Sequence, residues 1–207
     1  MKSSKANQLR EGVRKAYSAA AQRPQDRHPF PVGRHFAESI GYPPDVLDGL
    51  PSVSVDPFCR VSNVAIFAEI PQGATVLDLG CGAGLDSLIA ARRVGPGGRV
   101  TGVDFSEAML ARARRAVTEA GFVNVGFYQA DAENLPIRSG SIDVALVNGI
   151  FNLNPARQAI FRELARVLRQ GGEVYAAELI LRKPLARVKA FLKNLLKIQT
   201  SQANWFA

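Results

Sequence analysis

A short apolar segment that runs directly into three closely spaced glycines restricts the fold of this chain more than any other feature. Residues 75–79 read TVLDL, and glycines follow at positions 80, 82 and 84. Glycine lets the backbone turn sharply and come close to a ligand because it carries no Cβ. A buried strand, a glycine-rich turn and a following helix predict a parallel α/β sheet with a ligand at the turn.

Apolar residues along 71–181 alternate between the period of strands and the period of helices, which is typical of a parallel sheet wrapped by helices. Ser106 and Gly121 are suited to begin and end one helix, an Asn-Pro pair at 154–155 to begin another, and a glycine pair at 171–172 to turn into a strand. We therefore expect an α/β fold with a Rossmann-like parallel sheet. The predicted strands cover residues 75–79, 99–103, 124–129, 142–147 and 173–179, and the predicted helices cover 84–94, 106–120 and 155–169.

The segments on either side of this region differ from it. Residues 182–207 carry six Lys or Arg and no acid, and the stripes along 185–198 predict a basic amphipathic helix. We interpret that helix as a lid or docking element, with a membrane-surface helix as the alternative. The chain thus divides into a helical cap (1–70), a sheet domain (71–181) and a basic tail. The cap holds seven of the twelve prolines, which argues against long helices after the first one at 7–21 and predicts short helices at 34–40 and 63–70.

The net charge of +8 is concentrated at the two ends of the chain. Residues 36–181 hold 12 basic and 16 acidic side chains, so the centre is mildly acidic. A nucleic-acid enzyme gathers positive charge around its site, so we expect no nucleic acid as partner. The basic ends fit solvated helix faces or, alternatively, arms that meet an anionic partner.

Composition also bears on where the protein works. No apolar run approaches the roughly 20 residues that span a bilayer, and no signal peptide follows the charged start. Two cysteines, Cys59 and Cys81, cannot form a disulfide framework. We therefore expect reduced thiols in a cytoplasmic protein.

The spacing of the glycines argues against a dinucleotide site. The dinucleotide fingerprint needs glycine at its first, third and sixth positions, and the sixth position counted from Gly80 is Leu85. Asp78 also places a carboxylate where it would repel a diphosphate and attract a cationic amine. We expect a cationic or zwitterionic ligand, and a nucleotide-dependent oxidoreductase is the disfavoured alternative.

Polar residues also end three further predicted strands. Asp104 follows Gly84 by twenty residues and could accept hydrogen bonds from two ribose hydroxyls. Asp131 could accept from an adenine amine, and Asn148 ends the fourth strand. Each has a simple structural alternative, as a helix N-terminal acid, a turn former and a loop residue. Because ligands bind at the carboxyl ends of strands in open α/β sheets, the group predicts one ligand-binding edge.

Together these features resemble the class I S-adenosylmethionine-dependent methyltransferases, and the resemblance covers residues 71–181. It implies S-adenosylmethionine as cofactor and a small-molecule substrate. The residues that it assigns to the cofactor surround four parts of that molecule. Asp78, Gly80 and Gly82 would lie by the methionine moiety, Asp104 by the ribose, Asp131 and Ala132 by the adenine, and Asn148 beside the transferable methyl group. Gly84 and Phe105 complete the predicted cofactor-binding set.

A narrower resemblance points to the arsenite methyltransferases, which grip trivalent arsenic with cysteine thiolates, soft ligands for a soft centre. Two of those cysteine positions are Val61 and Gly149 in this chain, and a third would follow Trp205. Cys59 lies near one of them and is the candidate catalytic residue, whereas Cys81 sits in the glycine turn, where a small residue suffices. No metal site is predicted. The similar segments are residues 56–63, 90–100, 102–104, 107–110, 147–153 and 161–163.

Nothing after residue 181 reads as a strand, so the predicted sheet lacks the last strands of the methyltransferase fold. The fifth strand would then be an exposed apolar edge, which proteins normally cover. The basic tail, a partner or a missing segment could cover it. A further hypothesis is truncation of the chain just before a reactive cysteine or selenocysteine.

Three functions remain open: a methyltransferase acting on arsenite, another metalloid or a thiol; a cofactor-binding module without its own catalysis; and the oxidoreductase. No general base stands out, since His28 and His35 lie in the cap. That favours a soft or carbanionic acceptor. Tyr17, Phe30 and Phe36 of the cap could close over the cofactor or pack a core of their own.

Overall fold

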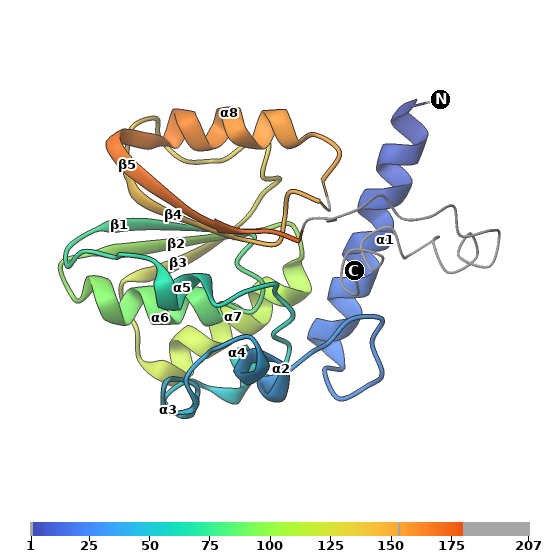
Figure 1. The fold of residues 1–207 in the computed structure, drawn as a ribbon, viewed down its shortest axis with the longest axis horizontal. Helices are drawn as coiled ribbons and strands as arrows, with labels where there is room; N and C mark the ends of the chain where they lie inside the picture. Colours follow the sequence, from blue (N-terminus) through green and yellow to red (C-terminus); the bar gives the residue numbers. More distant parts are fainter. Residues whose placement is uncertain (1, 153, 180–207) are drawn as a thin grey trace.

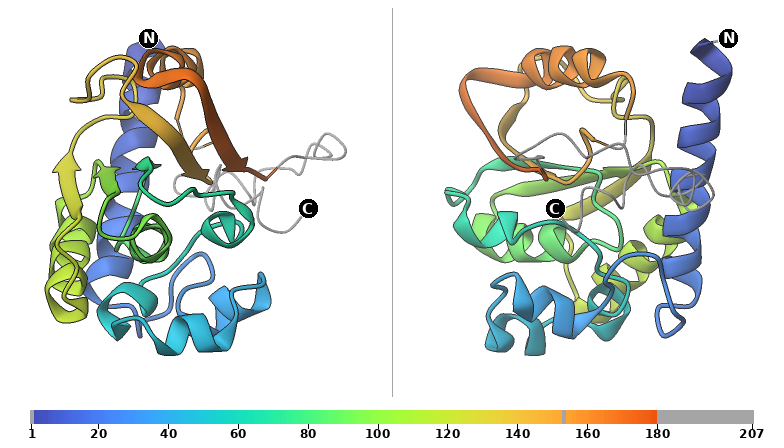
Figure 2. Two further views of the ribbon diagram at one scale, coloured as in Figure 1. Left: turned by 90° about the vertical axis from the view of Figure 1, so that its left-hand side faces the viewer. Right: turned by 45° about the vertical axis from the view of Figure 1, so that its right-hand side comes forward.

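The computed structural model describes residues 2–152 and 154–179. Its centre is a sheet of five parallel strands in the order β3-β2-β1-β4-β5, with helices on both faces (Figure 1; Figure 2). The expected α/β fold with a Rossmann-like parallel sheet is confirmed. The strands are β1 (Thr75–Leu79), β2 (Arg99–Asp104), β3 (Val125–Gln129), β4 (Ile142–Asn148) and β5 (Leu168–Ala177). The helices are α1 (Lys2–Gln22), α2 (Arg34–Ser39), α3 (Pro44–Asp48), α4 (Ser52–Val55), α5 (Val64–Phe67), α6 (Leu85–Val94), α7 (Glu107–Ala120) and α8 (Arg157–Val167).

Different helices cover the two faces of the sheet because successive residues of a strand point to opposite sides. Val76 of β1 belongs to the hydrophobic cluster that contains Leu88 of α6, while Leu77 belongs to the cluster that contains Ile160 of α8. In Figure 1, α8 lies above the sheet and α6 and α7 lie below it. Because all five strands run parallel, their carboxyl ends lie together at one end of the sheet.

Helix α7 begins and ends as its capping residues predict. The Ser106 hydroxyl accepts a hydrogen bond from the Met109 N–H at 3.4 Å. Gly121 follows the last turn in the left-handed conformation, with φ of 69°. Both features satisfy backbone groups that a helix end would otherwise leave unpaired.

The prediction that α8 begins at Pro155 is wrong, because the helix begins at Arg157. The side-chain oxygen of Asn154 accepts from the Ala156 N–H at 2.7 Å. Asparagine commonly bonds to the backbone two residues ahead in this way and so makes a turn. The Asn-Pro pair therefore forms a turn before the helix instead of its first residues.

Strand β5 also differs from expectation, whereas the other four strands agree with it to within one residue. It spans Leu168–Ala177 instead of 173–179, and its pairing with β4 is regular only from Glu173 onward. The glycine pair at 171–172 lies in the irregular stretch, and Gly171 has a φ of 76°. The glycines therefore mark a distortion inside a longer strand, not the turn that precedes it.

The N-terminal segment is helical, as predicted, but its helices differ in extent. Helix α1 covers Lys2–Gln22 instead of 7–21, α5 is shorter than the predicted 63–70, and the sequence did not predict α3 or α4. Helix α1 stands across the carboxyl ends of the strands (Figure 1). Tyr42 of this segment shares a hydrophobic cluster with Val76 of β1, so part of the segment packs on the core of the sheet domain.

The C-terminal features predicted from the sequence, including the helix at 185–198, lie outside the described residues. Among the described strands, β5 pairs with β4 alone. None of the helices in the described part of the chain has both the length and the apolar character that crossing a membrane requires.

Candidate functional site

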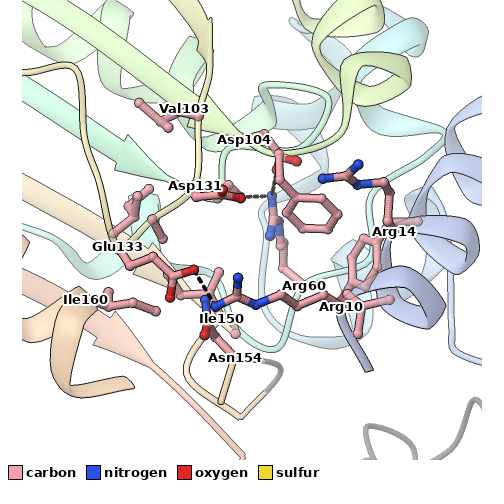
Figure 3. Close-up of a pocket in the computed structure, with 18 residues that line it drawn as sticks. Arg10, Arg14, Arg60, Val103, Asp104, Asp131, Glu133, Ile150, Asn154 and Ile160 are labelled. Carbon is pink, nitrogen blue, oxygen red and sulfur yellow. Dashed lines mark hydrogen bonds and ion pairs between the residues drawn. The ribbon is translucent and has the colours of Figure 1, made fainter. Parts of the chain in front are cut away.

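A crevice lies at the carboxyl ends of the strands, between the sheet and α1 (Figure 3). Its cavity volume is about 100 Å³, and the cavity opens to solvent. This is the position at which ligands bind in open parallel sheets. Five of the residues that the sequence assigns to a cofactor line it: Gly80, Asp104, Phe105, Asp131 and Ala132.

The glycine turn after β1 is tied to the end of β2. Gly80 and Gly82 have φ angles of 75° and 55°, a region that favours glycine. The Gly80 N–H donates to the Val103 carbonyl oxygen at 2.7 Å. The Gly82 N–H donates to Asp104 Oδ2 at 2.8 Å, and the Ser106 N–H donates to Oδ1 at 2.8 Å. Two backbone bonds thus hold the buried carboxylate, whose oxygens can each accept a further bond from a ligand.

Arg60 fills the space over this turn. Its guanidinium donates to the Gly80 carbonyl oxygen and lies 3.7 Å from Asp104 Oδ2 (Figure 3). A Cβ built on Gly82 would meet a guanidinium nitrogen at 2.6 Å. Burial opposes the guanidinium charge, but the anionic groups around it, Asp104 first, raise the pKa of Arg60 above its ordinary value. The crevice therefore contains a permanent cation of the protein itself.

Two further carboxylates are fully enclosed near the turn. Asp78 Oδ2 accepts from the Ser87 hydroxyl at 2.5 Å, and Asp86 Oδ1 accepts from the Tyr42 hydroxyl at 2.5 Å. Burial, and after it the charge of Asp86, raises the pKa of Asp78 to about 7. Burial also raises the pKa of Asp86. Asp78 is consequently partly protonated near neutral pH.

Asn148 at the end of β4 clamps the segment that precedes the sheet. Its side-chain oxygen accepts from the Val61 and Ser62 N–H groups, both at 3.2 Å. Its side-chain nitrogen donates to the Ser62 carbonyl oxygen at 2.7 Å and to Asp86 Oδ2 at 3.0 Å. Two donors and two acceptors are all that a carboxamide offers, so this side chain is saturated within the protein.

The end of the crevice beyond β3 holds polar atoms without hydrogen-bond partners. Arg10 of α1 forms an ion pair with Glu133, which follows β3 (Figure 3). Among the described residues, Arg10 Nε and Glu133 Oε2 are buried and accept or donate no hydrogen bond. Unpaired buried polar atoms are costly. With Asp131 and Ala132 also lining this end, the crevice suits a ligand that brings polar atoms of its own.

A second, smaller cavity adjoins the crevice at Tyr17 and Arg60, which line both spaces. Gly82, Cys59 and Cys81 line this second cavity and not the crevice. Burial raises the pKa of the Cys59 thiol to about 12 and also raises that of Cys81. Since the thiolate is the nucleophile and the metal ligand, neither cysteine is activated in this state.

Three predicted cofactor residues, Asp78, Gly84 and Asn148, line neither space. Sequence reasoning also missed Arg60, although it stands beside Cys59 in the segment that the arsenite methyltransferase resemblance placed ahead of the sheet. No group of three or more His, Cys, Asp or Glu side chains within 2–152 and 154–179 is arranged to hold a metal ion.

The cap aromatics take both of the roles left open by the sequence. Tyr17 lines the crevice from α1. Phe30 packs against Tyr17 with ring centroids 5.1 Å apart, in a cluster with Cys59. Phe36 packs away from the crevice against Phe58, at 6.2 Å. The cap thus closes one wall of the crevice and also contributes to the core.

Comparison with known proteins gives a consistent result. The Methyltransferase domain family matches residues 70–205. An arsenite methyltransferase from Halobacterium salinarum is 38% identical over 152 residues, which are 72% of this chain and 38% of the relative. A demethylmenaquinone methyltransferase from Listeria monocytogenes is 40% identical over 107 residues, which are 51% of this chain and 45% of the relative. The chain therefore spans less than half the length of these two curated relatives.

A solved structure extends the likeness into the N-terminal segment. The crystal structure of an arsenic(III) S-adenosylmethionine methyltransferase from Chlamydomonas reinhardtii superposes with a TM-score of 0.60 at 28% identity. The match covers 81% of this chain and 56% of that chain. A match over 81% of the chain is longer than the sheet domain and the tail together, so it also includes part of the segment ahead of the sheet.

Proposed function

Because this chain belongs to the class I S-adenosylmethionine-dependent methyltransferases, we propose that it methylates a small acceptor whose attacking atom is soft, such as arsenite or a thiol. S-adenosylmethionine is the methyl donor of this family. The observation that carries the proposal is the crevice at the strand ends, with Asp104 held by two backbone N–H groups beside a glycine turn.

The groups in the crevice fit an adenosine-containing donor. The Asp104 carboxylate is suited to a pair of ribose hydroxyls, because its oxygens lie close together and retain acceptor capacity. The unpartnered Glu133 Oε2, with Asp131 beside it, is suited to an exocyclic amine. Gly80 and Gly82 allow a ligand to approach the backbone, since neither carries a Cβ. We propose these residues, with Phe105 and Ala132, as the donor site.

The donor supplies an activated methyl group on a sulfonium, which an acceptor takes by in-line displacement. The task of the protein is then to hold the two reacting atoms about 3 to 3.5 Å apart and to exclude water. Tyr17 and Arg14 of α1 cover the crevice and would serve the second purpose. A hydroxyl acceptor would require a base, but no histidine is among the residues that line the crevice. Among the described residues, the lining of the crevice thus favours arsenite, whose lone pair attacks without deprotonation, or a thiol that arrives as its thiolate.

Arsenite is our first candidate acceptor because the arsenite methyltransferase match covers 72% of the chain. Thiolates bind arsenic, yet Cys59 and Cys81 are both buried. Arsenic would therefore have to be presented by an external thiol such as glutathione, because these are the two cysteines of the sequence. Demethylmenaquinone is the second candidate, supported by 40% identity over 107 residues with an enzyme named for it.

Methyl-labelled S-adenosylmethionine tests the proposal directly. We expect labelled product with arsenite plus glutathione or with a small thiol, and none with simple alcohols. Transfer of the label to demethylmenaquinol and to no other acceptor would select the second candidate. Calorimetry with S-adenosylhomocysteine and with a nicotinamide dinucleotide provides the control. Binding of the first without any turnover would favour a cofactor-binding module, and binding of the dinucleotide alone would favour an oxidoreductase.

A further inference from the structure

We propose that Arg60 divides the donor site and controls entry of the amino-acid end of S-adenosylmethionine. The inference rests on the proposed function, which assigns this donor to the crevice. Arg60 lines both the crevice and the second cavity, with only 9% of its surface exposed. The glycine turn passes through both spaces, since Gly80 lines the first and Gly82 the second. One side chain therefore lies between two spaces that share a wall.

The guanidinium occupies the room that Gly82 leaves. A Cβ on Gly82 would meet Arg60 at 2.6 Å, whereas a Cβ on Gly80 would first meet Ile150 at 2.5 Å and lie in ordinary contact with Arg60 at 3.6 Å. Glycine at such positions allows a ligand to touch the backbone. Here the protein's own side chain makes that contact, through its bond to the Gly80 carbonyl oxygen. A ligand that follows the turn from one space to the other must displace it.

The two spaces suit different parts of the donor. Asp104, Asp131 and Glu133 line the crevice and offer acceptors for a ribose and an adenine. The Arg60 nitrogen is 3.7 Å from Asp104 Oδ2, too far to use that oxygen as a hydrogen-bond acceptor. Adenosine can therefore bind without moving Arg60. The amino-acid end of the full donor would extend past the turn, toward Gly82, and Arg60 blocks that path.

Charge adds to the obstruction. The donor is a cation at its sulfonium, and Arg60 forms an ion pair with the carboxylate of Asp104. A guanidinium at this position offsets the negative field that would attract the donor. Removing the guanidinium should therefore favour entry for the steric reason, which applies equally to S-adenosylhomocysteine. The electrostatic gain applies only to the sulfonium of the donor and is opposed by the attraction of its α-carboxylate to a guanidinium.

The side chain can move while its backbone stays in place. Its remaining bond is a long one, 3.5 Å to the Asn148 carbonyl oxygen. The Asn148 side chain meanwhile holds the backbone of Val61 and Ser62, the two residues that follow Arg60. A clamped backbone allows the guanidinium to leave its bond to the Gly80 carbonyl oxygen and its ion pair with Asp104 without unfolding the segment.

Calorimetry with two ligands, S-adenosylhomocysteine and adenosine, separates the two spaces. For Arg60→Ala we expect the Kd of S-adenosylhomocysteine to fall at least about tenfold, because the blocked state no longer reduces the apparent affinity. The Kd of adenosine should stay within about twofold. Arg14→Ala is the matched control, since it removes one positive charge from the same crevice but contacts the Phe105 ring, at 5.9 Å, instead of the turn. It should change both Kd values by the same factor.

The outcomes distinguish this inference from the proposed function. If Arg60→Ala binds S-adenosylhomocysteine no more tightly than the native protein does, or more weakly, Arg60 is not an obstruction. The inference is then overturned, while the proposed function stands. If that variant fails to bind adenosine because it does not fold, Arg60→Met keeps the aliphatic packing without the polar bonds and should show the same selective gain. If neither ligand binds the native protein or any variant, the proposed function and the inference fall together.

Discussion

At the ends of β2 and β3 acidic side chains line the crevice, whereas at the ends of β1 and β4 the polar side chains are used inside the protein. Asp104 ends β2, Asp131 follows β3, and both line the crevice. Asp78 bonds to Ser87, and Asn148 bonds to the segment ahead of the sheet. Strand ends with similar chemistry therefore do two different jobs.

The position of the strands in the sheet explains the difference. β1 is the central strand and β4 lies on one side of it, where the polar groups at their ends bond to α6 and to the clamped segment. β2 and β3 lie on the other side of β1, and residues at and after their ends line the crevice under α1. We infer that the ends of β1 and β4 hold the scaffold and the ends of β2 and β3 hold the ligand.

Asp104→Ala should produce the largest loss of ligand binding. We expect the Kd of S-adenosylhomocysteine to rise about 100-fold, because hydrogen bonds to a charged group contribute about 1.5 to 3 kcal/mol each. Asp143→Ala is the control, since Asp143 accepts from Thr75 at the opposite end of the sheet and does not line the crevice. It should lower stability and leave the Kd unchanged. Equal losses of affinity in both variants would show that Asp104 acts through folding alone.

Asn148→Ala should show the reverse pattern. Losing the carboxamide removes the acceptor of the Val61 and Ser62 N–H groups and one of the donors to Asp86, so the free energy of unfolding should fall by about 2 to 4 kcal/mol. Urea denaturation measures this fall, and calorimetry should show a smaller effect on ligand affinity than in Asp104→Ala. A variant of native stability that no longer binds the ligand would instead make Asn148 a ligand contact, as the sequence suggested, and would break the comparison.

Asp78 should make stability depend on pH in a direction unusual for an acid. Its pKa is raised to about 7 in the folded protein, so folding favours the protonated form. This contribution is present below about pH 4, the ordinary range of an aspartic acid, and is lost as the pH rises through 7. The free energy of unfolding should therefore fall between pH 4 and 7 by at most about 1.4 kcal/mol per pH unit from this group. Asp78→Asn should flatten that slope, and an unchanged slope would place the ionised form in the native protein.

Asp131→Ala tests the outer end of the crevice. We expect adenosine to bind about tenfold more weakly, in line with a loss of about 1.4 kcal/mol for one polar contact. The melting temperature should not change, because the hydrogen bond that Asp131 accepts from the Asn134 N–H is made by its backbone carbonyl oxygen, which the substitution keeps. Glu133→Gln is the comparison variant, since it keeps the side chain's shape but weakens the ion pair with Arg10. An unaffected Kd in Asp131→Ala would move the adenine away from this residue.

The fold could be predicted from the sequence because its signals are local. The TVLDL strand, the glycine turn and the caps of α7 each depend on residues within a few positions of one another. The misplaced start of α8 and the distorted β5 arose where turn chemistry at Asn154 and Gly171 was assigned to the wrong side of an element boundary. Such boundaries depend on which strand pairs with which, and local signals do not contain that information.

The site was predictable only as far as its strand ends. Placing Asp104 and Asp131 near one another follows from parallel topology alone. The roles of Asn148 and Arg60 depend on contacts between residues 86 to 88 positions apart in the chain. A strand-end position indicates that a polar side chain is near the site, but only packing decides whether that side chain faces the ligand or is consumed by the scaffold.

Cys59 provides the smallest expected effect and tests whether the second cavity takes part in the chemistry. Burial raises the pKa of its thiol to about 12, so at pH 7 only about one molecule in 10⁵ carries the reactive thiolate. Cys59→Ser should bind S-adenosylhomocysteine within about twofold of the native affinity, since losing one weak donor costs little. In the native protein, iodoacetamide should modify Cys59 far more slowly than it modifies free cysteine, with Cys81→Ser used to isolate the signal. Rapid modification at pH 7, or more than a tenfold loss of methyl transfer in Cys59→Ser with native donor binding, would make Cys59 a reactive residue. The second cavity would then belong to the catalytic site together with the crevice.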